Sequence, residues 1–124
     1  MEKIKLGFAP TRRFCFSKED AHRFKNIILE KMKEYECVEL VDIEDVNEEG
    51  LLYDSVEDIE AIAEKFIANK VDAVFFPHCN FGTEDAVAKV AKKVGKPVLL
   101  WGPRDEDPLE DGTRLRDTQC GLFA

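Results

Sequence analysis

Long hydrophobic runs are missing from this sequence of 124 residues. No apolar stretch approaches the roughly 18–20 residues that cross a bilayer, and the first residues lack the apolar core of a signal peptide. Basic charge is also scarce, because 18 Lys and Arg stand against 26 Asp and Glu, which gives a net charge of −8. Nucleic acids and anionic membranes both require a basic footprint. We therefore expect a cytoplasmic protein with no nucleic-acid partner and no membrane partner.

Residues that bind metals are few and widely spaced. The four cysteines form no Cys-x-x-Cys unit, and the two histidines, His22 and His78, belong to no ligand-spaced motif. No Ser/His/Asp or Cys/His arrangement and no Gly-rich phosphate-binding motif is visible. The carboxylates at 48–49 and 105–111 are expected to lie in solvated loops. We therefore assign no catalytic residue, no metal ligand and no cofactor to this chain.

What the sequence does contain is a hydrophobic pattern that changes its period several times. Apolar residues three and four positions apart predict helices, and short continuous apolar runs predict buried strands. Ser17 and Ser55 each stand at a predicted helix start, and Gly95 ends the third helix. The pattern predicts strands over residues 4–9, 38–43, 72–76 and 97–101, and helices over 18–35, 55–69 and 82–94.

This alternation of strands and helices is typical of an α/β protein with a parallel sheet covered on both faces. Right-handed crossovers most simply give the strand order 2-1-3-4, so we expect a flavodoxin-like three-layer sandwich with at least four strands. The last segment differs, because residues 103–116 are polar and turn-rich and a helix starts after Asp117 without a fifth strand. We interpret residues 1–124 as a single domain, the amino-terminal fragment of a longer multidomain chain.

The first candidate binding residues follow the first strand. Ligands of open parallel sheets bind beyond the carboxyl ends of the strands, where the strand order reverses, which here lies between the first and third strands. Arg12 and Arg13 occupy that position, and their forked donors suit anionic or hydroxylated ligands. The alternative is that one of them pairs with a nearby acid such as Glu84 or Asp85.

Further candidates follow the third and fourth strands. His78 and Asn80 supply donors and acceptors for sugar-like hydroxyls, and Gly82 would let a ligand approach the start of the third helix. Trp101 offers a ring that can stack on the apolar face of a sugar. Each candidate has a structural alternative, because His78 can cap or pack in an ordinary loop and a lone tryptophan at a strand end often belongs to the core.

Two segments of the chain resemble a known family. The chain is similar to the amino-terminal domain of L-fucose isomerase-like proteins over residues 72–85 (Asp-Ala-Val-Phe-Phe-Pro-His-Cys-Asn-Phe-Gly-Thr-Glu-Asp) and over residues 99–124, which end in Cys-Gly-Leu-Phe-Ala. The L-arabinose isomerases resemble it more distantly. The resemblance implies an aldose–ketose isomerase, usually hexameric, that uses manganese or another divalent metal to move a proton between adjacent carbons of an open-chain sugar.

The resemblance also implies where the functional groups of such an enzyme lie. Its metal ligands and catalytic acid/base groups belong to other domains, so the isolated chain is expected to be inactive. Arg12 and Arg13 would lie in the first substrate-facing loop, and His78, Cys79 and Asn80 in the second. The partners would be the remaining domains, neighbouring subunits and the sugar, and the isolated domain is expected to form a homodimer as readily as a monomer. The alternative is a free-standing or excised flavodoxin-like binding or scaffold domain without enzymatic activity.

Overall fold

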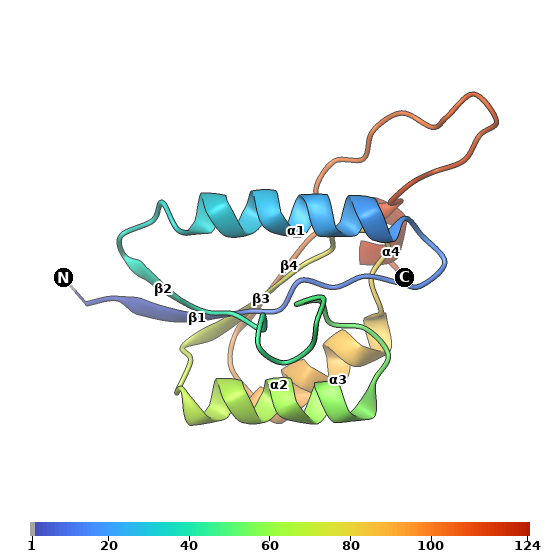
Figure 1. Ribbon diagram of the computed structural model, residues 1–124. Coiled ribbons are helices and arrows are strands. Elements are labelled where there is room, and N and C mark those ends of the chain that lie inside the picture. The colour runs from blue at the N-terminus through green and yellow to red at the C-terminus, as the bar shows by residue number, and fades with distance from the viewer. Residues whose placement is uncertain (1) are drawn as a thin grey trace.

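Strands and helices alternate along the chain in a computed structural model, which describes residues 2–124 (Figure 1). All the predicted elements are present, and their ends differ from the prediction by a few residues. The largest difference lies at Tyr35, which falls beyond the first helix because its N–H closes an exposed turn onto the carbonyl of Met32. The strands are β1 (Ile4–Phe8), β2 (Val38–Val41), β3 (Ala73–Pro77) and β4 (Val98–Trp101), and the helices are α1 (Lys18–Met32), α2 (Val56–Ala68), α3 (Glu84–Val94) and α4 (Thr118–Leu122).

The four strands form one parallel sheet in the order β2-β1-β3-β4. This order confirms the prediction. The chain moves from β1 to one side to form β2 and then returns across β1 to form β3. The crevice that such a reversal creates lies between the carboxyl ends of β1 and β3. Across the described residues, 2–124, none of the helices is both long and apolar enough to span a bilayer.

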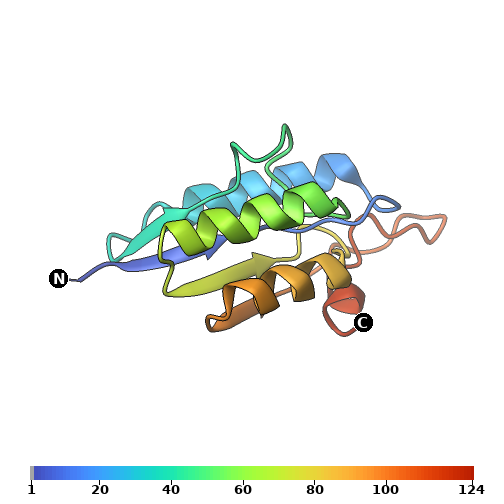
Figure 2. The ribbon, with the colours of Figure 1, turned by 90° about the horizontal axis from the view of Figure 1, so that it is seen from below.

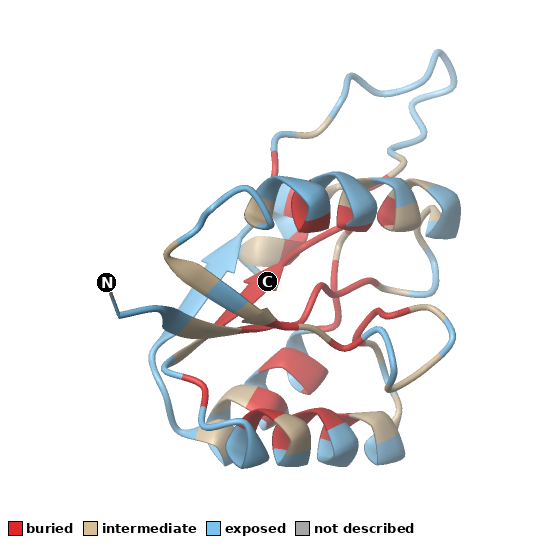
Figure 3. Ribbon diagram, turned by 60° about the vertical axis from the view of Figure 1, so that its left-hand side comes forward, coloured by how far each residue is buried: buried red, intermediate tan, exposed pale blue. Residues whose placement is uncertain are grey.

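The sheet is covered by α1 on one face and by α2 and α3 on the other (Figures 1 and 2). Successive side chains of a strand point to opposite faces, so β3 contributes to both layers. Phe75 packs in the buried cluster beneath α1, whereas Val74 and Phe76 pack in the cluster beneath α2 and α3. The buried residues accordingly lie along β3, at the end of β1 and on the inner helix faces (Figure 3). This arrangement confirms the predicted α/β three-layer fold.

Helix ends follow the local signals in the sequence. The hydroxyls of Ser17 and Ser55 accept hydrogen bonds from the N–H groups of Asp20 and Asp58, which satisfies otherwise unpaired donors in the first turns of α1 and α2. After α3, Gly95 adopts a left-handed φ of 68°, the conformation that commonly ends a helix and that glycine adopts most easily. Each of these ends was predicted from residue type alone.

β4 forms one edge of the sheet and remains exposed. It pairs with β3, and its other edge has no neighbouring strand within residues 2–124. The exposed fractions of its residues are 42%, 57%, 45% and 45% from Val98 to Trp101. All four residues are apolar, so this edge presents an uncovered hydrophobic strand.

The segment after β4 is held in place by a buried arginine. Arg116 is fully buried, with its guanidinium 3.5 Å from the ring centre of Phe24 and its Nε donating to Glu106 at 2.8 Å. Asp105 accepts hydrogen bonds from the N–H and the hydroxyl of Thr118 at the start of α4. The prediction of a solvated acidic loop is therefore wrong for Asp105, whose side chain is 15% exposed because it caps the start of α4, whereas Glu106 stays exposed while it pairs with Arg116.

Candidate functional site

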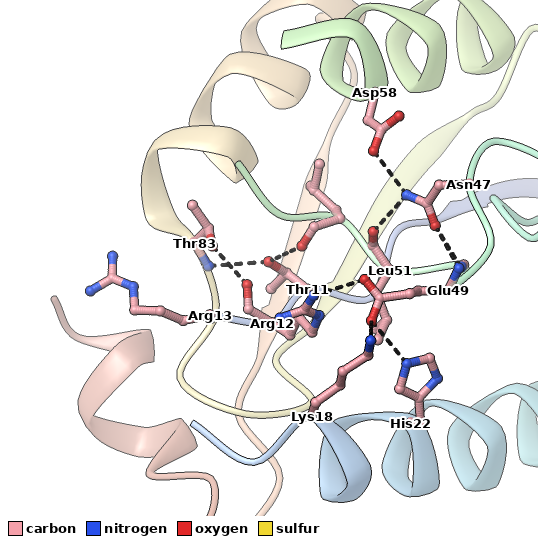
Figure 4. A network of polar contacts seen from close by, with 12 residues as sticks. Thr11, Arg12, Arg13, Lys18, His22, Asn47, Glu49, Leu51, Asp58 and Thr83 are labelled. Carbon is pink, nitrogen blue, oxygen red and sulfur yellow. Dashed lines mark hydrogen bonds and ion pairs between the residues drawn. The ribbon is translucent and has the colours of Figure 1, made fainter. Parts of the chain in front are cut away.

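Buried polar contacts around Thr11 join the carboxyl ends of β1 and β3. Its N–H donates to the carbonyl of Pro77, and its own carbonyl accepts from the N–H of Cys79, each at 3.0 Å. Its hydroxyl donates to the carbonyl of Leu52 at 2.9 Å and accepts from the N–H of Thr83 at 3.2 Å. Thr11 therefore holds the loops that follow β1, β2 and β3 together at one edge of the sheet (Figure 4).

Asn80, a predicted binding residue, lies fully buried between the loops that follow β1 and β3. Its amide oxygen accepts from the N–H groups of Arg13 at 2.7 Å and Gly82 at 3.2 Å. Its amide nitrogen donates to the carbonyls of Arg13 and Ser17, both at 3.3 Å. All four hydrogen-bonding positions of the amide are thus used within the chain. Asn80 shapes the site by fixing the backbone of Arg13, and its direct contact with a sugar stays a prediction.

Arg12 is buried and turned toward the loop that follows β2 (Figure 4). Its Nη2 donates to Oε2 of Glu49 at 2.8 Å, and its guanidinium lies 4.2 Å from the ring centre of Tyr53. One of the two arginines thus pairs with an acid, as the alternative interpretation expected, but that acid is Glu49 rather than Glu84 or Asp85. The charge of Arg12 is balanced inside the domain.

Three basic side chains surround the carboxylate of Glu49. Besides Arg12, Nζ of Lys18 and Nε2 of His22 lie 3.3 and 3.1 Å from its Oε1, and both come from the first part of α1. Burial alone would raise the pKa of Glu49, but the hydrogen bonds from Arg12 and His22 and the charge of Arg12 lower it to about 2. The expected solvated loop at 48–49 is therefore wrong for Glu49, whose side chain is only 18% exposed because α1 and the loop after β1 close over it.

Arg13 points in the opposite direction from Arg12 (Figure 4). Its guanidinium lies 4.8 Å from the ring centre of Phe81, and no carboxylate pairs with it in the part of the chain that the structure describes. Arg13 lines a cavity of about 250 Å³ at the carboxyl edge of the sheet, where the strand order reverses. The other residues that line this cavity are Phe14, Cys15, Tyr53, Asp54 and Thr83.

The cavity combines polar and apolar groups in the manner of a site for a polyhydroxylated ligand. Arg13 offers N–H donors and Asp54 offers acceptors, while the phenol of Tyr53 can act as either. The hydroxyl of Thr83 is already used, because it donates to the carbonyl of Arg12 at 2.7 Å. Phe14 is 79% exposed and adds an aromatic face beside these groups. Such a lining can hold hydroxyl groups and the apolar face of a ring together.

His78 is buried and lies outside this cavity. Its Nδ1 is 3.0 Å from the carbonyl oxygen of Phe81, which can only accept, so Nδ1 carries the proton. Burial lowers the pKa of His78 and so favours the neutral ring, although the hydrogen bond to Phe81 acts in the opposite direction. A Cβ at Gly82, where φ is +84°, would stand 2.6 Å from this Nδ1. The space expected at Gly82 for a ligand is therefore filled by the His78 ring.

Trp101 and Cys79 also lie apart from the cavity. The Trp101 ring stacks on Phe75 at a centroid distance of 6.2 Å, and its carbonyl accepts from the N–H of His78. Cys79 is fully buried, and burial raises the pKa of its thiol to about 12, so the thiol is protonated and unreactive at neutral pH. Of the predicted binding side chains, Arg13 alone among the described residues lines this cavity, and sugar contacts by Trp101 and His78 stay predictions.

The loop after β2 supplies site residues that the sequence analysis did not identify. Glu49, Tyr53 and Asp54 come from an acidic, turn-rich stretch, of which only residues 48–49 were expected to be solvated. One signal was available, because this stretch follows the carboxyl end of a strand adjacent to the reversal point. The carboxyl ends of parallel strands lie at the same edge, so residues that follow β2 had to lie near those that follow β1.

The described part of the chain offers no ligand set for a metal ion. Nowhere in residues 2–124 do three His, Cys, Asp or Glu side chains lie together as a bound metal requires. The described residues of this domain therefore do not fit the divalent metal that the family resemblance implies.

Comparison with known proteins adds one finding to this geometry. The family model for the N-terminal domain of fucose/sulfoquinovose isomerase matches residues 7–124. No curated protein and no solved structure matches the chain. The matched range includes all three loops that surround the cavity.

Proposed function

This chain belongs to the family of fucose/sulfoquinovose isomerase N-terminal domains, and from that premise we propose that it forms one wall of the sugar pocket in an aldose–ketose isomerase. Isomerisation moves a proton between adjacent carbons of the open-chain sugar, which requires an acid/base group and a polarised carbonyl. We assign both to the remaining domains, together with manganese or another divalent metal. This domain then binds and orients the sugar and is not catalytic alone.

The observation that carries the proposal is the unpaired guanidinium of Arg13 in the cavity at the carboxyl edge of the sheet. A buried or half-buried arginine without a carboxylate retains its donors for a ligand. Asn80 fixes the backbone of Arg13, and Arg12 is held away by Glu49, so the orientation of Arg13 is preorganised. A rigid donor of this kind suits the hydroxyl oxygens of a sugar.

The partners of the domain are proposed from its uncovered strand. β4 presents four apolar residues along an unpaired edge. Hydrophobic edges of this kind are normally covered by a further strand, a helix or another chain. We propose that the remaining domains or neighbouring subunits of the isomerase cover β4 and thereby place the cavity next to the catalytic groups.

An activity measurement tests how the functional groups are distributed. The 124-residue chain, supplied with manganese and either L-fucose or L-arabinose, is expected to show no turnover, because its described residues contain no group of side chains that could hold the metal. Measurable isomerisation would contradict this assignment. The gene sequence beyond Ala124 provides a second check, since an immediate stop codon would favour a free-standing binding or scaffold domain instead.

Kinetics of the enzyme that contains this domain test the role of the cavity. Arg13→Ala is expected to raise KM by about ten- to a hundredfold, the effect of losing a charged hydrogen bond, with a smaller change in kcat. Arg114→Ala, which removes an exposed arginine from the segment after β4, is the matched control and should leave KM unchanged. Arg12→Ala and Asn80→Ala act through the loop backbone and should raise KM or lower kcat. Unchanged kinetics in all three site variants would place these residues in a purely structural role.

A further inference from the structure

Another cavity, of about 430 Å³, lies at the opposite edge of the sheet from the cavity that Arg13 lines. It is placed at the amino ends of two strands, because residues 70–72 lead into β3 and Lys96 leads into β4. Its volume is within the range of roughly 300–1,000 Å³ that small-molecule sites have. The apolar part of its lining comes from the ends of α2 and α3 and the start of β3, namely Phe66, Ile67, Val71 and Val94.

The charged side chains of this cavity are mostly basic. Lys70 and Lys96 both line it, and neither forms an ion pair within residues 2–124. Asp72 is the one acid of the lining, and its Oδ2 accepts a hydrogen bond from the N–H of Lys5 at 2.8 Å. The lining therefore carries two positive charges and one negative charge, in a chain whose net charge is −8. A local excess of positive charge attracts anions.

Lys70 occupies a backbone position that favours glycine. Its φ is +55°, and the N–H of Val71 after it donates to the carbonyl of Phe66, which closes the end of α2. The end of α3 has the same left-handed conformation, but there the residue is Gly95. A lysine costs stability in this conformation because its Cβ is crowded by the backbone. A cation could balance the negative end of α2 from an unstrained position, so the strained position indicates a further role for this side chain.

We propose that this cavity binds a small organic anion, whose carboxylate or phosphate group pairs with Lys70 and Lys96 and whose apolar body packs on Ile67 and Val94. Lys70 follows α2 and Lys96 follows α3, and both line the same cavity, so one anionic group can contact the two ammonium groups. The apolar lining favours an organic anion over an inorganic one. The inference goes beyond the proposed function, because this cavity shares no lining residue with the cavity of Arg13.

NMR titration of the 124-residue chain tests this site directly. The probes are benzoate and phenyl phosphate, and benzamide is the uncharged analogue with the shape of benzoate. The two anions are expected to shift the amide resonances of residues 66–72 and 94–96 and to leave those of residues 12–15 and 53–54 unchanged. Benzamide should bind about tenfold more weakly, because it pairs with neither lysine. Added salt should weaken the binding of the anions only.

The variant Lys70→Gly separates binding from stability. Glycine relieves the left-handed strain, so the midpoint of urea unfolding should rise, whereas the affinity for benzoate should fall about threefold through the loss of one exposed ion pair. Lys96→Gln should lower the affinity by a similar factor. Lys33→Gln is the matched control, because it removes the same charge from the end of α1, on the other face of the sheet, and should leave binding unchanged.

Four results would overturn the inference. They are the absence of shifts at residues 66–72 and 94–96, equal affinities for benzoate and benzamide, unchanged benzoate binding in both Lys70→Gly and Lys96→Gln, and a lower urea midpoint for Lys70→Gly. The last result would show that the lysine stabilises the helix end, which contradicts the strain on which the proposal depends. The proposed function is tested separately by the KM of Arg13→Ala, so its failure and the failure of this site are distinguishable.

Discussion

Two adjacent arginines at the end of β1 have opposite environments. Arg12 is buried, paired with Glu49 and stacked on Tyr53, whereas Arg13 faces the cavity without a carboxylate partner. Neighbouring side chains of an extended segment point to opposite sides, so fixing one of them also orients the other. At the scale of single residues, Glu49 therefore influences the cavity through Arg12, although it does not line it.

Replacing Glu49 by glutamine is expected to destabilise the fold. A neutral amide cannot balance Arg12, whose guanidinium would remain buried, and we expect the free energy of unfolding to fall by about 1–3 kcal/mol. Urea unfolding followed by circular dichroism measures this change. Glu48→Gln is the matched control, because Glu48 is the exposed neighbour in the same loop. Equal destabilisation by the two variants would contradict the role given to the Glu49 carboxylate.

Acidification should remove the stabilisation that the ionised carboxylate of Glu49 gives to the fold. The pKa of Glu49 is lowered from 4.5 to about 2 in the folded protein, so its ionised form stabilises the fold at any pH above 4.5. This stabilisation is lost as the pH falls from 4.5 toward 2, where the unfolded chain takes up a proton before the folded chain does. The stability difference between the unmodified chain and Glu49→Gln is thus expected to shrink across that window. A difference that stays constant from pH 7 to pH 3 would show that the carboxylate charge is not its source.

At the scale of secondary-structure elements, the segment after β4 is held by a few side-chain contacts rather than by regular structure. Residues 102–117 contain neither helix nor strand, and α4 is only five residues long. Arg116 compensates for this by packing on Phe24 of α1 while its charge is met by Glu106. A cation over an aromatic ring, away from water, is a strong local contact.

The loss of Arg116 should therefore release the segment. Arg116→Met keeps an unbranched apolar side chain on Phe24 but removes the hydrogen bonds to Glu106 and to the carbonyl of Arg104. We expect limited proteolysis between residues 104 and 117 to become about tenfold faster, since the local opening free energy falls by the value of a charged hydrogen bond. Arg114→Met, an exposed arginine two residues earlier, should be cleaved at the original rate. Similar cleavage rates for both variants would disprove the anchoring role.

At the scale of the whole molecule, helices cover both faces of the sheet, and β2 and β4 form its two edges. β1 and β3 lie in the centre, with apolar clusters on both faces. β4 stands at the edge with four exposed apolar residues and no charged side chain between them. Edge strands are usually protected by a charge, a bulge or a covering segment, so this edge favours association.

Self-association through β4 can be measured directly. The 14.2 kDa chain is expected to elute from gel filtration as a dimer at high concentration and to dissociate on dilution. Leu99→Lys places a charge on the exposed strand and should shift the chain to monomer. Ile27→Lys, which changes another exposed apolar residue on α1, should not. A concentration-independent monomer for the unmodified chain would contradict this use of β4.

Local signals in the sequence were sufficient for the secondary structure and for the order of the strands. Hydrophobic periodicity, the N-caps Ser17 and Ser55 and the terminating Gly95 depend on residues within a few positions of one another. The strand order followed from the handedness of parallel crossovers, which is nearly invariant. These properties are decided by local geometry and by chain chirality, so the sequence by itself determined them.

Only the tertiary structure decided which polar side chains are occupied and which remain open to a ligand. Arg12 pairs with Glu49 across 37 residues of sequence, and Asn80 binds the backbone of Arg13 across 67. Periodicity reports which face of an element is buried, but it contains no information about contacts between distant loops. For that reason, Arg12 and Arg13 were equivalent candidates for ligand binding in the sequence. The loops after β1, β2 and β3 meet at one edge of the sheet. There the carboxylate of Glu49 balances the charge of Arg12, whereas no carboxylate of the described residues balances that of Arg13.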